Sequence, residues 1–199
     1  MSDFFALISR MRYIERWGLM RSSIPENVQE HSHMVAVLAH ALGVIRRDVL
    51  KKPCDPNFLA AAALYHDAPE ILTGDMPTPI KYHSGRISEA YHEVERAAAE
   101  KLINMLPVEL QSAFEPFISG EVGEDEKRFV KAADRLSAYI KCVEERKAGN
   151  REFLSAEAQT RRRIEDMGLP EADYFLKHFM PAFEKNLDEL GTMTQEDEG

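Results

Sequence analysis

Hydrophobic residues recur three or four positions apart along almost the whole chain, which is the spacing of amphipathic α-helices. The alternating runs and paired turn residues that mark β-hairpins are missing from the sequence. This pattern predicts an all-α protein, a single-domain helical bundle. We expect helices near residues 3–17, 27–47, 56–72, 86–105, 125–148, 151–166 and 171–190, with one further short helix after Pro107.

Capping and helix-breaking residues mark the limits of some of these segments. Asn27 followed by Glu30 matches a capping box, in which two side chains satisfy backbone N–H groups at a helix start. Further along, Pro77 and Pro79 resist helix continuation, so residues 73–83 are predicted to be the longest irregular stretch inside the domain.

The size of the chain suits one domain, because 199 residues of which 44% are hydrophobic can bury a sizeable core. Residues 1–190 are predicted to form this domain, and the acidic residues 191–199 to be a disordered tail. Cys54 and Cys142 lie far apart and outside any CxxC pattern. Two free thiols in a reducing cytoplasm are therefore favoured over a disulfide.

The charge balance excludes two classes of partner. Acidic residues outnumber basic ones by 34 to 25, giving a net charge of −9, and no basic cluster is present for displacing counterions from a nucleic acid. No stretch approaches the 18 apolar residues that a membrane span needs, and the N-terminal segment lacks the features of a secretory signal. We therefore expect a cytoplasmic protein that binds neither nucleic acid nor membrane.

Three ionisable residues interrupt an otherwise apolar segment, "LYHDAPEIL". His66, Asp67 and Glu70 would share one face of a helix, because positions three and four apart are neighbours. A buried carboxylate needs a cation, a hydrogen-bond network or a shifted pKa. The segment is therefore a candidate site, although a purely structural polar cluster is the alternative.

Two other predicted helices offer partners for these residues. His31 lies one turn inside the helix that begins near residue 27, and Asp134 follows two alanines that allow close approach. Together with His66 and Asp67 they would form a mixed nitrogen and oxygen shell. Such a shell suits manganese, cobalt, zinc, iron or nickel better than calcium.

The order of these residues, H…HD…D, resembles that of HD-domain phosphohydrolases. The stretches "IERWGLMR", "ENVQEHSHMVA", "YHDAPEILTGDMPTPIKY" and "KAADRLSAYIKCVEE" further resemble the 5'-deoxynucleotidases of that superfamily, over roughly residues 4–190. The resemblance implies an all-helical homodimer that removes the 5'-phosphate from deoxyribonucleoside 5'-monophosphates. It also implies a divalent metal cofactor, Co²⁺, Mn²⁺ or another transition metal.

The resemblance also implies roles for individual residues. The implied metal ligands are His31, His66, Asp67 and Asp134. Glu70 matches the residue that acts on the attacking water. The positions implied to hold the nucleotide are Arg16, Trp17, Asp75, Met76, Pro77 and Thr78, together with His31, Asp67 and Asp134 among the metal ligands.

Elementary chemistry agrees with this reaction class, because a phosphate monoester dianion repels nucleophiles until positive charge and an activated water are supplied. Arg16 could clamp the phosphate through its planar fork. Asp75 could either contact the sugar or protonate the leaving oxygen, and we expect Trp17 to pack against the sugar and disfavour ribose. The rival interpretations are an HD-domain phosphodiesterase, a nucleoside triphosphate phosphohydrolase, and a helical interaction module with a structural metal.

Overall fold

The computed structural model describes residues 2–81 and 83–191. Its α-helices are α1 (Phe4–Ile8), α2 (Val28–Val44), α3 (Pro56–Tyr65), α4 (Glu70–Thr73), α5 (Thr78–Lys81), α6 (Gly85–Ile103), α7 (Val108–Ser119), α8 (Glu124–Lys147), α9 (Leu154–Glu165) and α10 (Pro170–His178). Single turns of 3₁₀-helix or π-helix cover Ser9–Tyr13, Ile45–Val49, Arg151–Phe153, Met180–Glu184 and Leu187–Leu190. The described residues form no β-strand, so the predicted all-α fold is confirmed.

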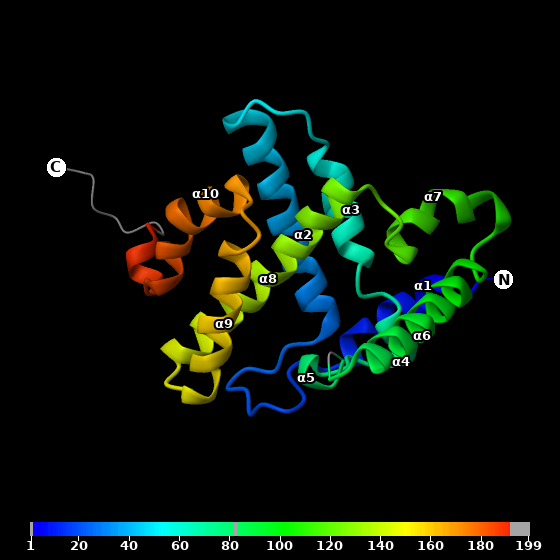
Figure 1. The fold of residues 1–199 in the computed structure, drawn as a ribbon, viewed down its shortest axis with the longest axis horizontal. Helices are drawn as coiled ribbons and strands as arrows, with labels where there is room; N and C mark the ends of the chain where they lie inside the picture. The colour runs from blue at the N-terminus through cyan, green and yellow to red at the C-terminus, as the bar shows by residue number, and fades with distance from the viewer. Residues whose placement is uncertain (1, 82, 192–199) are drawn as a thin grey trace.

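Helix α2 occupies the centre of the molecule and packs against both α3 and α8 (Figure 1). The predicted capping box is present at its start, where the Asn27 side chain accepts from the Glu30 N–H and the Glu30 carboxylate accepts from the Asn27 N–H. Near its other end, a Cβ atom added to Gly43 would lie 2.9 Å from the Cα atom of Pro56. Only glycine therefore allows α2 and α3 to approach so closely.

Two hydrophobic clusters build the interior. The larger one joins α2, α3, α8 and the C-terminal helices through buried residues that include Val35, Leu42, Leu59, Phe129, Leu136, Ile164 and Phe175. The smaller one joins α1, α6 and α7 through Phe4, Ala68, Ala99, Leu102, Ile103, Leu106 and Ile118. Figure 1 shows the second group of helices lying to one side of the bundle formed by the first.

The segment after α3 connects these two clusters. Ala63 belongs to the larger cluster and Ala68 to the smaller one. His66 and Asp67 lie between these two alanines in sequence, so both sides of the segment that carries them are held by packed core. Tight packing of this kind limits the freedom of the two side chains.

The first predicted helix, residues 3–17, is too long. Helical structure ends at Tyr13, and the chain then becomes extended. The reason is a tertiary contact, because the Arg16 N–H donates to the Glu26 carbonyl at 2.9 Å in an isolated antiparallel bridge. Trp17 then adopts a left-handed backbone with φ of 62°.

The predicted continuous helix over residues 56–72 is interrupted. Helix α3 ends at Tyr65, and α4 begins only at Glu70. Pro69 explains the break, because proline lacks the N–H that would bond to the carbonyl four residues earlier, that of Tyr65. The sequence "HDAP" therefore forms a turn rather than a helical face.

Other predicted limits also change. The expected helix over residues 171–190 stops at His178, shortly before Pro181, and continues only as 3₁₀ turns. The expected irregular stretch 73–83 contains α5, a single turn. Gly191 lies in a turn, and the rest of the predicted tail, residues 192–199, lies outside the described residues.

Two further expectations concern the cysteines and the membrane. Cys54 and Cys142 are both free thiols, as predicted. Over the described part of the chain, no helix has the length and apolar character of a membrane span.

Candidate metal and nucleotide site

His31 lies in the first turn of α2 and is completely buried. Its Nδ1 atom is 3.2 Å from the Ser137 hydroxyl on α8. Its Nε2 atom is 3.1 Å from Asp134 Oδ1, also on α8. One ring nitrogen thus has a hydroxyl partner, and the other faces a carboxylate.

His66 caps the end of α3, and a single contact defines its tautomer. Its Nδ1 atom is 2.7 Å from the Ala63 carbonyl oxygen. Because a carbonyl only accepts, Nδ1 must carry the proton, and the Nε2 lone pair of the neutral ring is left available. That Nε2 atom lies 3.1 Å from Asp67 Oδ2. Histidine ligands in metal sites are typically oriented by such a second hydrogen bond.

These residues fit a transition-metal ion. One ligand atom each from His31, His66 and Asp134 lies within 4.8 Å of the others. Both Nε2 atoms are buried and have no hydrogen bond of acceptable geometry. Buried polar atoms without partners are rare and call for an explanation. Two imidazole nitrogens with carboxylate oxygens are a donor set that zinc, cobalt, manganese and iron accept.

Asp67 links this cluster to the guanidinium of Arg16. Its Oδ2 atom is 3.7 Å from His31 Nε2 and 3.4 Å from Arg16 Nη1. Burial opposes ionisation of Asp67, but His66, His31 and Arg16 outweigh it and hold the pKa of the carboxyl below its usual range. Asp67 is therefore ionised and able to act as a ligand.

Glu70 and Asp75 differ from Asp67, because their pKa values are raised rather than lowered. Glu70 opens α4, is 8% exposed, and its Oε2 atom is buried without a hydrogen-bond partner. Burial, together with the negative charges of Asp67 and Asp75, raises the pKa of Glu70 to about 9. Burial also raises the pKa of Asp75. Neighbouring carboxyl groups whose pKa values are shifted in opposite directions are typical of active sites in which one group acts as an acid and another as a base.

The loop that carries Asp75 is held from α6. Gly74 ends α4 with φ of 74°, and its carbonyl accepts from the Tyr91 hydroxyl at 3.1 Å. At the far end of the loop, Lys81 Nζ donates to Glu95 Oε1 at 2.8 Å. Of the remaining predicted nucleotide contacts, Met76 and Pro77 are partly buried, whereas Thr78 is exposed and begins α5.

Arg16 and Trp17 follow the 3₁₀ turn Ser9–Tyr13, and the Arg16 guanidinium reaches Asp67 of the cluster. Only 13% of the Arg16 side chain is exposed. The Trp17 ring packs against Phe153, with centroids 5.2 Å apart. Its Nε1–H donates to Glu26 Oε2 at 2.7 Å.

Two residues next to the predicted set were missed in the sequence. Glu26 contacts both Arg16 and Trp17, and Ser137 contacts His31. Ser137 lies one helical turn after Asp134, so helix periodicity could have indicated it. Glu26 carries no such signal beyond its place directly before the helix that bears His31.

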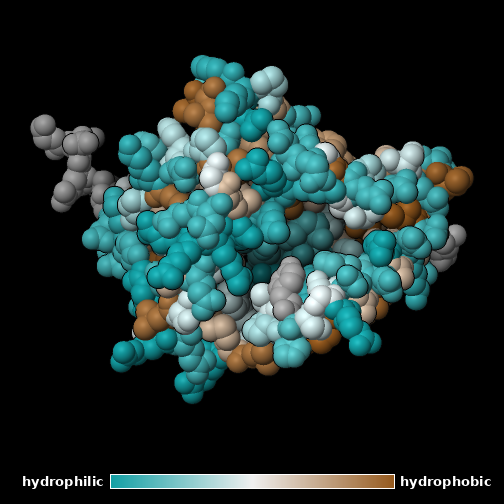
Figure 2. Space-filling view, in the orientation of Figure 1, coloured by the Kyte–Doolittle hydropathy of each residue, from teal (hydrophilic) through white to brown (hydrophobic). Residues whose placement is uncertain are grey.

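The surface is hollowed where these elements meet. Figure 2 shows a hydrophilic hollow between the part of the molecule containing α8 and the part containing α5 and α6. In Figure 1, which has the same orientation, the start of α2 and the end of α3 lie near this place.

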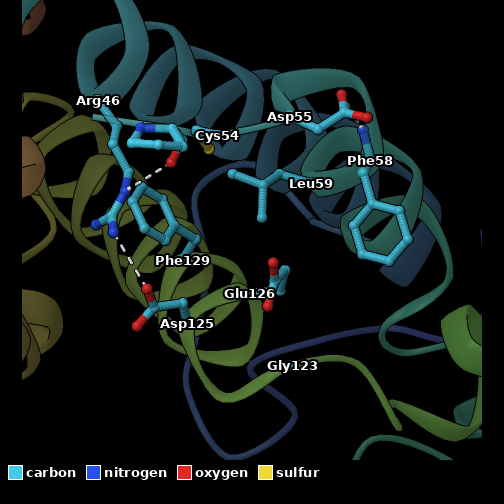
Figure 3. Close-up of a pocket in the computed structure, with 10 residues that line it drawn as sticks. Arg46, Cys54, Asp55, Phe58, Leu59, Gly123, Asp125, Glu126 and Phe129 are labelled. Atoms are coloured by element: carbon cyan, nitrogen blue, oxygen red, sulfur yellow. Dashed lines mark hydrogen bonds and ion pairs between the residues drawn. The ribbon is translucent and has the colours of Figure 1, made fainter. Parts of the chain in front are cut away.

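A separate cavity, of about 360 Å³, lies at the starts of α3 and α8 (Figure 3). Its lining contains none of the predicted site residues; it consists of Arg46, Pro53, Cys54, Asp55, Phe58, Leu59, Gly123, Asp125, Glu126 and Phe129. Arg46 already donates to the Pro53 carbonyl and pairs with Asp125 and Glu171. Its charge is thus neutralised, which makes this cavity a poor phosphate site.

Comparison with protein families gives a match over most of the chain. A family model described as "5'-deoxynucleotidase YfbR-like" matches residues 3–183. A protein of Vibrio atlanticus named 5'-deoxynucleotidase is 45% identical over 190 residues, which are 95% of this chain and 98% of the relative. A protein of Yersinia pestis with the same name is 47% identical over 191 residues, which are 96% of this chain and 97% of the relative.

Solved structures give the same fold. An HD-domain phosphohydrolase from Listeria innocua aligns with a TM-score of 0.79 and 25% identity, covering 91% of this chain and 88% of its own. A cyanophage S-2L HD phosphohydrolase, bound to dA and one catalytic Zn²⁺ ion, aligns with a TM-score of 0.63 and 21% identity, covering 91% and 96%.

Proposed function

Because the chain belongs to the YfbR-like 5'-deoxynucleotidase family, we propose that it hydrolyses deoxyribonucleoside 5'-monophosphates to deoxyribonucleoside and phosphate. The observation that carries this proposal is the pair of buried Nε2 atoms, of His31 and His66, which lack hydrogen bonds and face carboxylates at 3.1 Å. Arg16 lies next to this group. A cation site beside an arginine is what a phosphate monoester requires.

We assign the metal ligands to His31, His66, Asp67 and Asp134. A divalent transition-metal ion, with Co²⁺ or Mn²⁺ as the first candidates, would supply positive charge to the phosphoryl oxygens and lower the pKa of a water. Ala63 and Ser137 hold the two imidazole rings in the orientation that presents Nε2.

Glu70 is assigned to accept the proton of the attacking water. Its carboxyl is protonated at neutral pH in the protein alone, because burial and the charges of Asp67 and Asp75 raise its pKa to about 9. Positive charge at the cluster would offset those two carboxylates and favour the basic form of Glu70. A general base in this position contributes about 10² to 10⁴ in rate.

Arg16 is assigned to the phosphate and Asp75 to the nucleoside side of the scissile bond. The guanidinium is held by Asp67 and Glu26 through Nη1 and Nε, which leaves donors on the terminal nitrogens for phosphoryl oxygens. Asp75 has a raised pKa because it is buried, which suits donation of a proton to the leaving oxygen. A hydrogen bond to the sugar is the alternative role.

We propose that Trp17 selects deoxyribose, with Met76, Pro77 and Thr78 forming the rest of the nucleotide contact. A ring packed against C2' would leave a ribose hydroxyl buried without a partner, which costs about 1 to 3 kcal/mol. Replacing Trp17 by alanine should therefore lower the preference for dAMP over AMP, by roughly five- to 150-fold. An unchanged ratio of the two kcat/KM values would remove this role from Trp17.

A substrate panel tests the proposed reaction. The purified protein is incubated with Co²⁺ or Mn²⁺ and, separately, with dAMP, AMP, dATP and a cyclic dinucleotide, and free phosphate is measured, with an added phosphatase for the cyclic substrate. Phosphate from dAMP in preference to AMP is the expected result. Turnover of dATP or of the cyclic dinucleotide alone would favour the triphosphohydrolase or the phosphodiesterase. No turnover of any substrate would favour a structural metal in an interaction module.

We also propose that the protein is a cytoplasmic homodimer, whose single domain spans residues 1–190. The apolar side chains exposed on α6, Ile87 and Val94, are compatible with contact to a second copy. Sedimentation equilibrium should give twice the 22.7 kDa mass of the chain, and a monomer at micromolar concentration would contradict the dimer.

A further inference from the structure

The carboxylate of Glu26 lies between the two residues assigned to hold the substrate. Its Oε2 atom accepts from Trp17 Nε1 at 2.7 Å and from Arg16 Nε at 3.3 Å. Only 14% of its side chain is exposed. A single acid oxygen thus connects the side chain assigned to the phosphate with the one assigned to the sugar.

The backbone reinforces this connection. Glu15 and Asn27 form an isolated antiparallel bridge, in which the Arg16 N–H donates to the Glu26 carbonyl at 2.9 Å. Beyond it, the Val28 N–H donates to the Ile14 carbonyl at 2.9 Å. Glu26 is therefore fixed relative to residues 14–16 before its side chain makes any contact.

Trp17 needs such support because its backbone is strained. Its φ of 62° lies in the left-handed region, which a bulky residue other than glycine rarely adopts. Conformations of this kind persist only where surrounding contacts determine them. For Trp17 the side-chain contacts are the hydrogen bond to Glu26 and the packing on Phe153, and its carbonyl accepts from the Met20 N–H at 2.7 Å.

Arg16 needs the same support for a different reason. Its guanidinium donates Nε–H to Glu26 and Nη1–H to Asp67, so two carboxylates on different elements set the plane of the fork. Hydrogen bonds to ionised groups are stronger than neutral ones. Without Glu26, Asp67 alone would orient the guanidinium, and the side chain could rotate about that one contact.

We propose that Glu26 is a positioning residue, which fixes the Arg16 fork and the Trp17 ring together and so couples phosphate binding to sugar selection. This rests on the proposed function, because it presupposes that Arg16 and Trp17 hold a deoxynucleotide. Glu26 acts through these two residues, with no contact of its own to the substrate.

The test compares Glu26→Ala and Glu26→Gln with Glu152→Ala. Glu152 is the matched control, because its carboxylate accepts from the Arg21 backbone N–H, at 2.9 Å, in the same loop but four residues beyond Trp17. Four kinds of measurement are made for each variant: metal content, KM and kcat for dAMP, the dAMP to AMP ratio of kcat/KM, and the emission and acrylamide quenching of Trp17. Trp17 is the only tryptophan of the chain, so its fluorescence reports this position alone.

For Glu26→Ala we expect kcat/KM for dAMP to fall about 10- to 100-fold, mainly through KM, as expected when a charge-assisted contact that orients a binding group is lost. The dAMP to AMP ratio should fall as well, and Trp17 should become easier to quench. Metal content should stay at the wild-type level. Glu26→Gln should restore most of the loss, because its amide oxygen still accepts from Trp17 and Arg16.

Three results would overturn the proposal. Glu26→Ala could match Glu152→Ala in kinetics and fluorescence, in which case Glu26 positions nothing. Glu26→Ala could lose metal, which would mean that it acts through His31, whose Nδ1 lies 4.0 Å from Glu26 Oε1. Glu26→Gln could be as impaired as Glu26→Ala, which would leave the hydrogen bonds without a role.

The failure of the proposed function would look different. A wild-type protein inactive on every nucleotide would remove the deoxynucleotidase assignment. Trp17 fluorescence would still decide whether Glu26 holds the ring, and unchanged emission and quenching in Glu26→Ala would overturn the positioning role on its own.

Discussion

Two largely buried groups of charged residues include side chains of helix α8 and differ in how their polar atoms are satisfied. One is the cluster of His31, His66, Asp67 and Glu70 around Asp134, which lies near the middle of α8. The other is the pair of Lys141 and Glu145, about two and three turns further along α8, whose side chains are 7% and 1% exposed. Both occupy places where charge is costly.

The second group is the matched group, because its charged side chains pair with each other and with neighbouring protein groups. Lys141 Nζ donates to Glu145 Oε1 and to the Ile24 carbonyl, both at 2.5 Å. The Glu145 carboxylate also accepts from the backbone N–H groups of Ser23 and Ile24 and from the Asn150 amide. The group therefore fixes the loop before α2 and has no need of a ligand.

Several polar atoms of the first group have no such partners. The Nε2 atoms of His31 and His66 and the Oε2 atom of Glu70 are buried without hydrogen-bond partners. Satisfied burial of charge indicates a structural role, whereas unsatisfied burial at a hollow indicates a site for a ligand. Changes in the two groups should accordingly affect different properties.

The largest effect is expected from removing a proposed metal ligand. Asp67→Ala should lose stoichiometric metal and reduce turnover of dAMP by at least about 10³-fold, because the metal and the clamp on Arg16 are lost together. Metal analysis and phosphate release measure the two losses. Glu145→Gln is the control from the matched group and should keep its metal; a metal-replete Asp67→Ala protein would mean that the ligands are wrongly assigned.

Glu70→Gln should separate catalysis from metal binding within the first group. We expect turnover to fall by about 10² to 10⁴, because an amide cannot accept the proton of the attacking water. Metal content should change little, because Glu70 is not among the assigned metal ligands. The melting temperature of the metal-free protein should also change little, since in that state a carboxyl with a pKa of about 9 is already neutral at pH 7. Activity within threefold of wild type would remove Glu70 from the mechanism.

Lys141→Met should affect stability instead. It leaves the Glu145 carboxylate buried without its cation, and we expect a loss of about 3 kcal/mol in the free energy of unfolding. Urea denaturation measures this loss. The metal content of the folded variant should remain stoichiometric, and loss of metal without loss of stability would mean that the two groups are not separate.

The sequence predicted the chemistry of the first group better than its geometry. The order of His31, His66, Asp67 and Asp134 follows from helical periodicity and the family pattern, and the structure brings all four together. The turn at Pro69 was missed, because the periodicity of apolar residues continues across the break between α3 and α4.

The supporting contacts could not be predicted in the same way. Glu26 reaches Arg16 and Trp17 only because an isolated bridge aligns two segments ten residues apart. Lys141 and Glu145 form an ordinary i, i+4 pair in sequence, which more often lies on a solvated helix face. Their burial depends on the loop at Ser23, which no local pattern places against α8.

The smallest effect should come from titrating the matched group. Burial opposes ionisation of Glu145, but its hydrogen bonds from Lys141, Ser23 and Asn150 outweigh it and lower its pKa to about 2, from an ordinary value of 4.5. A carboxylate with a lowered pKa in the folded state stabilises the protein above the unfolded pKa, and this stabilisation is lost as the pH falls through the folded pKa. The window is therefore about pH 4.5 to 2.

Comparison of wild type with Glu145→Gln isolates this contribution, because glutamine keeps the shape of the side chain and does not titrate. At pH 6 we expect the variant to be less stable by about 1.5 kcal/mol, the size of a hydrogen bond to a charged group. This difference should shrink steadily below pH 4.5 and be nearly gone at pH 2, as followed by urea denaturation of metal-free protein. A difference that stays constant down to pH 2 would show that the Glu145 charge does not stabilise the fold. The two groups would then differ only in whether their buried polar atoms have hydrogen-bond partners.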